Sequence, residues 1–169
     1  MNLEIRQVMP SDDLEELGRI VLASYVALPG HPAEPDYEVE LAGVAARIES
    51  NRVFGAFESD VPLGCVTFVS GASEPHAEDL RPDEASFRML GVSPKAQGRG
   101  VGTALVRQCL QAGEEAGKRS VFIYSGEWMK TAHRMYDRLG FDRVPGRDWV
   151  LERPPITLLA FSRRLGEDA

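Results

Sequence analysis

The glycine-rich run at residues 97–102, Gln-Gly-Arg-Gly-Val-Gly, constrains the fold of this chain more than any other feature. It stands between an extended segment that ends near Val92 and a helical repeat that begins near Gly100. A helix that starts after such a turn exposes several backbone N–H groups at the positive end of its dipole. Because glycine has no side chain, an anion can approach this backbone closely. The run therefore predicts a phosphate-binding turn between a strand and a helix.

Two better-known phosphate loops do not match this run. A Walker loop needs a lysine and then serine or threonine after its last glycine, but Gly102 is followed by Thr103 and Ala104. A dinucleotide-binding turn would need glycine at position 103 and an acidic residue about twenty positions later, and that position falls near Ser120 and Val121. The run alone is compatible with another kind of phosphate site or with an ordinary helix cap.

The composition is that of an ordinary globular protein. The chain has 169 residues, 43% hydrophobic and 27% charged, which fits a single domain over residues 1–169. The formal charge of -7 disfavours nucleic acid as a partner. No apolar run approaches the length of a membrane span, so no membrane association is expected. Residues 1–6 are not typical of a secretory signal, and we expect a cytoplasmic protein.

The cysteines and histidines do not indicate a metal site. Cys65 lies in an apolar strand-like run and Cys109 on the apolar side of a predicted helix, so both are expected to be core residues. His31, His76 and His133 are far apart in sequence and show no paired spacing. We therefore expect no bound metal.

Hydrophobic periodicity predicts strands and helices along the whole chain. Strands are expected at residues 3–8, 52–58, 63–70, 85–92, 120–124 and 156–162, with a further extended piece opening at Phe141. Helices are expected from about residue 13 to 27, over 37–50, from the glycine run to Gly117, and over 132–139. In the strand over 85–92, Phe87 and Met89 should share one face, and Gly91 suggests a bulge or a close-passing ligand.

Two motifs stand in order along the chain. The first is Gln/Arg-x-x-Gly-x-Gly/Ala, matched by Gln97, Gly100 and Gly102. The second is Ala-x-x-x-Tyr-x-x-x-Gly-Phe, which starts at Ala132 and contains Tyr136. Both resemble motifs of the GNAT superfamily of acetyl-coenzyme A-dependent acetyltransferases, and the resemblance covers essentially the whole chain. It implies an α/β fold with a mixed, mostly antiparallel sheet of about seven strands and about four flanking helices, in which the fourth and fifth strands splay apart.

The resemblance also implies an activity and a donor. The expected reaction is transfer of the acetyl group of acetyl-coenzyme A to a primary amine by direct attack in a ternary complex. The amides of the glycine run would hold the pyrophosphate, while Leu90 would contact the thioester carbonyl and Val92 the pantetheine amide. The implied cofactor-binding residues are Leu90, Gly91, Val92, Gln97, Gly98, Arg99, Gly100, Val101, Gly102 and Thr103.

The catalytic residues are less clearly marked. Tyr136 corresponds to the tyrosine that members often use as a general acid toward the leaving thiolate, and a phenol is suited to that role. Ser86 stands where many members carry a base, so Glu84 and Glu127 are the candidate bases, although both could be surface acids. Many members have asparagine seven residues before the tyrosine, where this chain has Met129.

The acceptor is expected to be a small-molecule amine or a peptide. Residues 28–37 and 144–155 should carry its specificity, because loops on a rigid scaffold usually do. Asp148 could pair with an acceptor ammonium or could be an ordinary turn residue. Two alternatives stay open at this point: acetylation of a protein lysine or N-terminus, and a non-catalytic acyl-coenzyme A-binding module. The sequence is also compatible with a homodimer.

Overall fold

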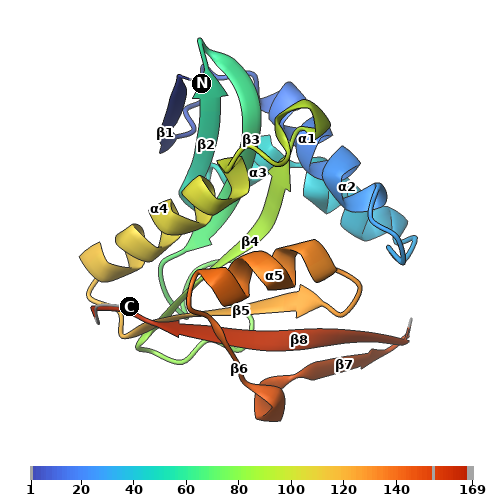
Figure 1. Ribbon diagram of the computed structural model, residues 1–169, viewed down its shortest axis with the longest axis vertical. Coiled ribbons are helices and arrows are strands. Elements are labelled where there is room, and N and C mark those ends of the chain that lie inside the picture. Colours follow the sequence, from blue (N-terminus) through green and yellow to red (C-terminus); the bar gives the residue numbers. More distant parts are fainter. Residues whose placement is uncertain (1, 154, 167–169) are drawn as a thin grey trace.

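The computed structural model describes residues 2–153 and 155–166 (Figure 1). Its strands are β1 (Leu3–Gln7), β2 (Val53–Glu58), β3 (Val61–Val69), β4 (Glu84–Val92), β5 (Ser120–Gly126), β6 (Asp142–Arg143), β7 (Trp149–Glu152) and β8 (Pro155–Arg164). Its helices are α1 (Leu14–Val26), α2 (Pro35–Ala42), α3 (Val44–Arg47), α4 (Val101–Glu115) and α5 (Lys130–Arg138). None of the helices in the described ranges is both long enough and apolar enough to cross a membrane.

The strands form one sheet in the order β1-β2-β3-β4-β5-β8-β6, and β7 also pairs with β8. Every pair is antiparallel except β4 and β5, which run parallel. The parallel pair arises because α4 carries the chain back across the sheet between these two strands. This mixed, mostly antiparallel sheet confirms the fold class expected from the sequence.

Helices cover both faces of the sheet (Figure 1). On one face, α4 and α5 pack over a cluster that includes Phe68, Phe87 and Leu105. On the other, α1, α2 and α3 pack over a separate cluster that includes Leu17 and Leu41. The sheet therefore has two apolar faces, which explains the long buried runs in β2 and β3.

Two elements differ from the sequence-based expectation. The helix expected over 37–50 is divided at Gly43, whose φ of -85° and ψ of 50° are not helical. At the break, the backbone N–H of Gly43 donates to the carbonyl of Glu40 at 3.0 Å. The buried side chain of Arg47 donates to the same carbonyl and to that of Leu41, and so stabilises the end of α2. The second difference is β7, which pairs with the start of β8 in a stretch that the sequence indicated only as a variable loop.

The side chains of β4 do not alternate regularly between the two faces of the sheet. Met89 has a φ of 55°, and the pairing of β3 with β4 shifts register between Cys65 and Thr67. As a result, Phe87 packs on the α4 side and Met89 on the α1 side, so the expectation that they share a face is wrong. Gly91 pairs with Cys65 directly beside this register shift, in line with the expected bulge. A Cβ at Gly91 would lie 2.7 Å from Cα of Val21, so glycine also permits the close approach of α1, and its contact with a ligand stays a prediction.

Candidate active site

A pocket opens where β4 and β5 separate. These strands pair only at Glu84 with Ser120 and at Ala85 with Val121, after which β4 follows β3 and β5 follows β8. The gap contains a pocket of about 470 Å³. Its walls come from β4, β5, α1, α2, α5, β7, β8 and the loop between β3 and β4. The splayed strands confirm the geometry that the resemblance implied.

The glycine run lies at the N-terminus of α4, beside the end of β4. Gly98 and Gly100 have φ values of 76° and 82°, and Gly100 is the residue that precedes the first helical turn. No side chain caps this helix, so its first amides are left for another acceptor. Val101 is buried in the core and fixes the start of the helix. The chain thus forms the predicted turn between strand and helix, with free amides at the positive end of the dipole.

Two side chains of the run make contacts of their own. The amide Nε2 of Gln97 donates to the carbonyl of Val92 at 3.2 Å, which ties the turn to the end of β4. The guanidinium of Arg99 donates to the carboxylate of Glu58 at 3.1 Å, and both side chains are partly exposed. Leu90 lines the pocket. Of the expected cofactor residues, Leu90 thus lines the pocket and the glycine run follows the end of the same strand, while Gly91 and Val101 are buried. The contacts of these residues with a cofactor stay a prediction.

Tyr136 projects from α5 into the wall of the pocket. It is buried and packs against the rings of Phe87, Phe141 and Phe161, with centroid separations between 5.5 and 5.9 Å. Burial raises the pKa of its phenol. The hydroxyl is therefore protonated at neutral pH and able to donate a hydrogen bond or a proton.

The two carboxylates expected as bases are not brought to this pocket. Glu84 lies where β4 and β5 are still paired, and both of its oxygens accept from the guanidinium of Arg147 at 2.7 and 3.0 Å. Glu127 follows β5 and is exposed. Neither is among the described residues that line the pocket. The sequence placed Glu84 on the correct strand but could not show that Arg147, distant in sequence, occupies its carboxylate.

The two stretches expected to carry acceptor specificity do reach the pocket. From residues 28–37 come His31, Glu34 and Tyr37, and from residues 144–155 come Trp149 and Leu151, while position 154 lies outside the described residues.

The carboxylate of Asp148 has another role. Its oxygens accept from the guanidinium of Arg143 at 2.7 and 2.8 Å, and Oδ1 also accepts from the backbone N–H of Ala160 at 2.7 Å. This favours the structural interpretation of Asp148.

With the site described, comparison with known proteins identifies its family. The model of the acetyltransferase (GNAT) family matches residues 14–141. The chain belongs to this family. This match confirms the family that the two sequence motifs indicated.

Individual relatives of this GNAT chain are distant. Over 138 residues it is 27% identical to mycothiol acetyltransferase of Rhodococcus erythropolis, a match that covers 79% of this chain and 44% of the relative. The chain spans less than half the length of the curated relatives that it matches.

Solved structures show the same fold over their whole length. PaiA N-acetyltransferase from Thermoplasma acidophilum, solved in complex with coenzyme A, has a TM-score of 0.73 at 15% identity, covering 97% of this chain and 99% of that one. YncA from Salmonella typhimurium, solved with its cofactor acetyl-CoA, has a TM-score of 0.67 at 16% identity, covering 100% of this chain and 97% of that one. At such low identities these likenesses establish the fold alone.

Sequence reasoning missed a set of polar side chains in the pocket of this GNAT chain. Nδ1 of His76 lies 3.3 Å from a carboxylate oxygen of Glu40, and the guanidinium of Arg88 forms a 2.5 Å ion pair with Glu78. All four line the pocket. His76 and Glu78 stand in a polar, proline-containing loop with no motif around them, and the α2 residue Glu40 is far from it in sequence. No spacing in the sequence therefore indicates that His76 and Glu40 lie close together.

Proposed function

We propose that this GNAT chain transfers the acetyl group of acetyl-coenzyme A to the primary amine of a small molecule by direct attack in a ternary complex. The observation that carries the proposal is the pocket between the splayed strands, which places Tyr136 and Leu90 in one cavity. That cavity adjoins the strand that leads to the glycine run. The solved neighbours that hold coenzyme A or acetyl-CoA support the same donor.

The lining of the pocket supports an acceptor that is cationic and has an apolar part. Aromatic rings of Tyr25, Tyr37, Tyr124 and Trp149 form much of its wall, with Tyr25 against Tyr37 and Tyr124 against Trp149. Such faces attract an ammonium group as well as apolar surface. A pocket of about 470 Å³ is of the size that small-molecule sites have.

Two further groups in the pocket support a bound ligand. Both ring nitrogens of His31 and Nε1 of Trp128 are buried, and no hydrogen-bond partner for them exists among the described residues. A buried polar group without a partner costs free energy. Hydrogen-bonding groups of an acceptor would remove this cost.

Tyr136 fits the last step of the proposed reaction. Attack of a neutral amine on the thioester carbonyl forms the C–N bond, and collapse of the tetrahedral intermediate breaks the C–S bond. The departing thiolate takes up a proton from the phenol, and the proton that the nitrogen loses as the amide forms returns to the phenolate through water, so that the net transfer is from nitrogen to sulfur. A protonated phenol in the pocket wall is suited to supply the proton to sulfur.

The test is a thiol-release assay with acetyl-coenzyme A and a panel of polyamines, aminoglycosides, amino acids and short peptides. We expect release above the blank with one or more small amines that carry an apolar part. Turnover with peptides alone would support the protein-directed alternative. Coenzyme A binding in calorimetry without turnover on any member of the panel would contradict the proposal and support the non-catalytic alternative, which the Met129 substitution motivates.

A further inference from the structure

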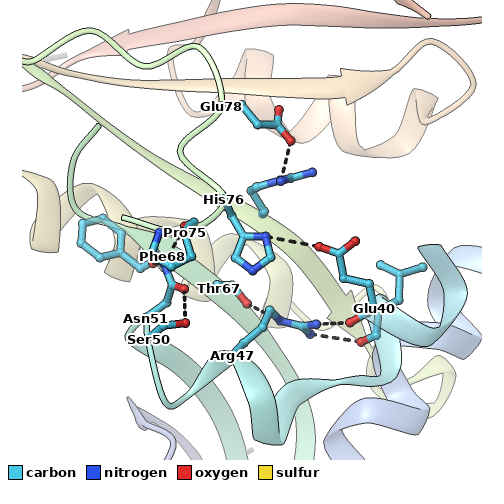
Figure 2. Close-up of polar contacts among 11 residues, drawn as sticks. Glu40, Arg47, Ser50, Asn51, Thr67, Phe68, Pro75, His76 and Glu78 are labelled. Carbon is cyan, nitrogen blue, oxygen red and sulfur yellow. Dashed lines mark hydrogen bonds and ion pairs between the residues drawn. The ribbon is translucent and has the colours of Figure 1, made fainter. Parts of the chain in front are cut away.

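His76 and Glu40 form a histidine–carboxylate contact inside the pocket. Nδ1 of His76 lies 3.3 Å from Oε1 of Glu40, and Figure 2 shows the imidazole edge directed at that carboxylate. An ionised carboxylate only accepts hydrogen bonds, so it favours the tautomer with the proton on Nδ1. Nε2 then keeps its lone pair. A base whose tautomer is fixed by a carboxylate is the arrangement that histidine-dependent proton transfer requires.

The loop that carries His76 is held in a costly conformation. The φ values of His76 and Glu78 are 68° and 46°, in the left-handed region that side chains disfavour. Each such residue costs on the order of 1 kcal/mol and persists only where the surroundings hold it. Here the buried side chain of Asn51 donates from Nδ2 to the carbonyl of Pro75 at 3.1 Å, directly before His76 (Figure 2). The residue after His76, Ala77, is buried.

The backbone of Glu40 is held by Arg47, four residues before Asn51 in the chain. Arg47 is buried, and its guanidinium donates to the backbone carbonyls of Glu40 and Leu41 and, at 2.9 Å, to Oγ1 of Thr67 on β3 (Figure 2). The short segment from Arg47 to Asn51 thus fixes the backbones of both Glu40 and the loop of His76. A buried polar network of this kind positions groups at a stability cost that a purely apolar core would avoid.

The charges around His76 keep it neutral. Burial lowers its pKa, and Arg88 on β4 and Arg47 on α3 lower it further, while Glu40 on α2 raises it. The other charged group of its own loop that lines the pocket, Glu78, is paired with Arg88. The pKa stays below the ordinary value of about 6.5, so the imidazole is unprotonated at pH 7.

The geometry points to His76, oriented by Glu40, as the general base that takes a proton from the acceptor ammonium in the proposed acetyl transfer. This inference rests on the proposed function. Nε2 takes the proton of R–NH3+, which gives R–NH2 and an imidazolium that Glu40 stabilises. The amine then attacks the thioester, and the imidazolium returns its proton to solvent after product release. The role left vacant by Glu84 and Glu127 is thereby filled from a loop outside the two family motifs.

The test compares acceptors of different basicity. An amine identified in the panel and its β,β-difluoro analogue differ in pKa, so the analogue is already largely neutral at pH 7.5. For His76→Gln, we expect kcat/KM to fall about 100-fold with the parent amine, the lower end of the range for general-base catalysis, and much less with the analogue. A structural role for His76 would lower both rates equally. Coenzyme A affinity and the melting temperature report whether the variant is folded.

Glu40→Gln tests the orienting carboxylate, with Glu38→Gln on the same helix as the matched control. Because Glu40 raises the pKa of His76, its removal should move the acidic limb of the kcat/KM profile to lower pH and reduce the plateau, whereas Glu38→Gln should change neither. Full activity of His76→Gln on the parent amine, or equal losses on both amines, would overturn the assignment of His76 alone. A wild-type protein that acetylates no amine would instead contradict the proposed function.

Discussion

The guanidinium of Arg147 forms a bidentate ion pair with the carboxylate of Glu84, with Nη1 2.7 Å from Oε2 and Nη2 3.0 Å from Oε1. The same guanidinium donates to the carbonyl of Asp79 at 2.8 Å and lies over the ring of Phe122. Both side chains of the pair are almost fully buried. The pair thus joins β4 to the turn before β7 at the closed end of the β4–β5 gap, at the end of β4 opposite to the glycine run.

Glu84→Gln should therefore reduce stability and leave catalysis intact. Removing one partner of a buried pair leaves the other charge uncompensated, and we expect a loss of about 3 kcal/mol in the free energy of unfolding. The matched control is Asp83→Asn, because the Asp83 carboxylate is exposed and 3.8 Å from Arg119, so its loss should be below about 0.5 kcal/mol. Urea unfolding measures both values. A large fall in kcat at a temperature where Glu84→Gln is folded would return Glu84 to the catalytic candidates.

The sequence predicted those parts of the molecule that depend on local pattern. The strand, glycine turn and helix around Gly100 follow from residues that are close in sequence, and the same holds for α5 and its stop at Gly140. Backbone periodicity and glycine conformation are local properties, so they can be read from neighbouring residues. The motifs around Gly100 and Tyr136 then sufficed to identify the fold.

The remaining features depend on contacts between distant segments. The face to which Met89 points follows from a register shift against β3, and Arg147, the partner of Glu84, lies 63 residues further along the chain. His76 meets Glu40 only because Arg47 and Asn51 hold both backbones. No period or spacing in the sequence encodes these pairings, which explains why the fold could be predicted while the carboxylate contacts of Glu84 and the pairing of His76 could not.

Gly100→Ala should weaken coenzyme A binding and reduce stability modestly. Its φ of 82° is costly for any residue with a Cβ, and we expect a stability loss of about 1 kcal/mol. A side chain at this position would also obstruct an anion at the α4 amides, so Gly100→Val should abolish detectable binding in calorimetry. Gly146→Ala, a position with open space and no positive φ, is the matched control and should change neither quantity. Unaltered affinity in Gly100→Val would exclude the turn as the pyrophosphate site.

Gly91→Ala should reduce stability and leave coenzyme A binding nearly unchanged. The added Cβ would lie 2.7 Å from Cα of Val21 and 2.8 Å from Oγ of Ser24, so α1 must move away from the sheet. Overpacking of this kind costs about 1–3 kcal/mol. We expect a lower melting temperature with coenzyme A affinity nearly unchanged in the folded protein. Weakened affinity without loss of stability would instead indicate that Gly91 contacts the cofactor directly.

Thiol reagents should distinguish the folded from the unfolded chain. Cys65 and Cys109 are buried, and burial raises the pKa of the Cys65 thiol to about 12 and that of Cys109 as well. A raised pKa lowers the thiolate fraction at pH 8, and thiolate is the reacting form. Ellman's reagent should therefore label neither cysteine in buffer and both in concentrated urea. Fast labelling of one thiol in the native protein would show that its surroundings open without global unfolding.

Tyr136→Phe should lower turnover and preserve the fold. The ring keeps its packing against Phe87, Phe141 and Phe161, so we expect stability within about 1 kcal/mol of wild type and an unchanged dissociation constant for coenzyme A. Loss of a general acid should reduce kcat by about 100-fold. Burial raises the pKa of the phenol, so it stays protonated through the alkaline part of an ordinary assay range. The ratio of wild-type to variant kcat should accordingly be constant between about pH 6 and pH 9, well below the ordinary tyrosine pKa. A ratio that falls toward high pH would mean that Tyr136 ionises in that range, and a ratio of one at every pH would remove it from the chemical step.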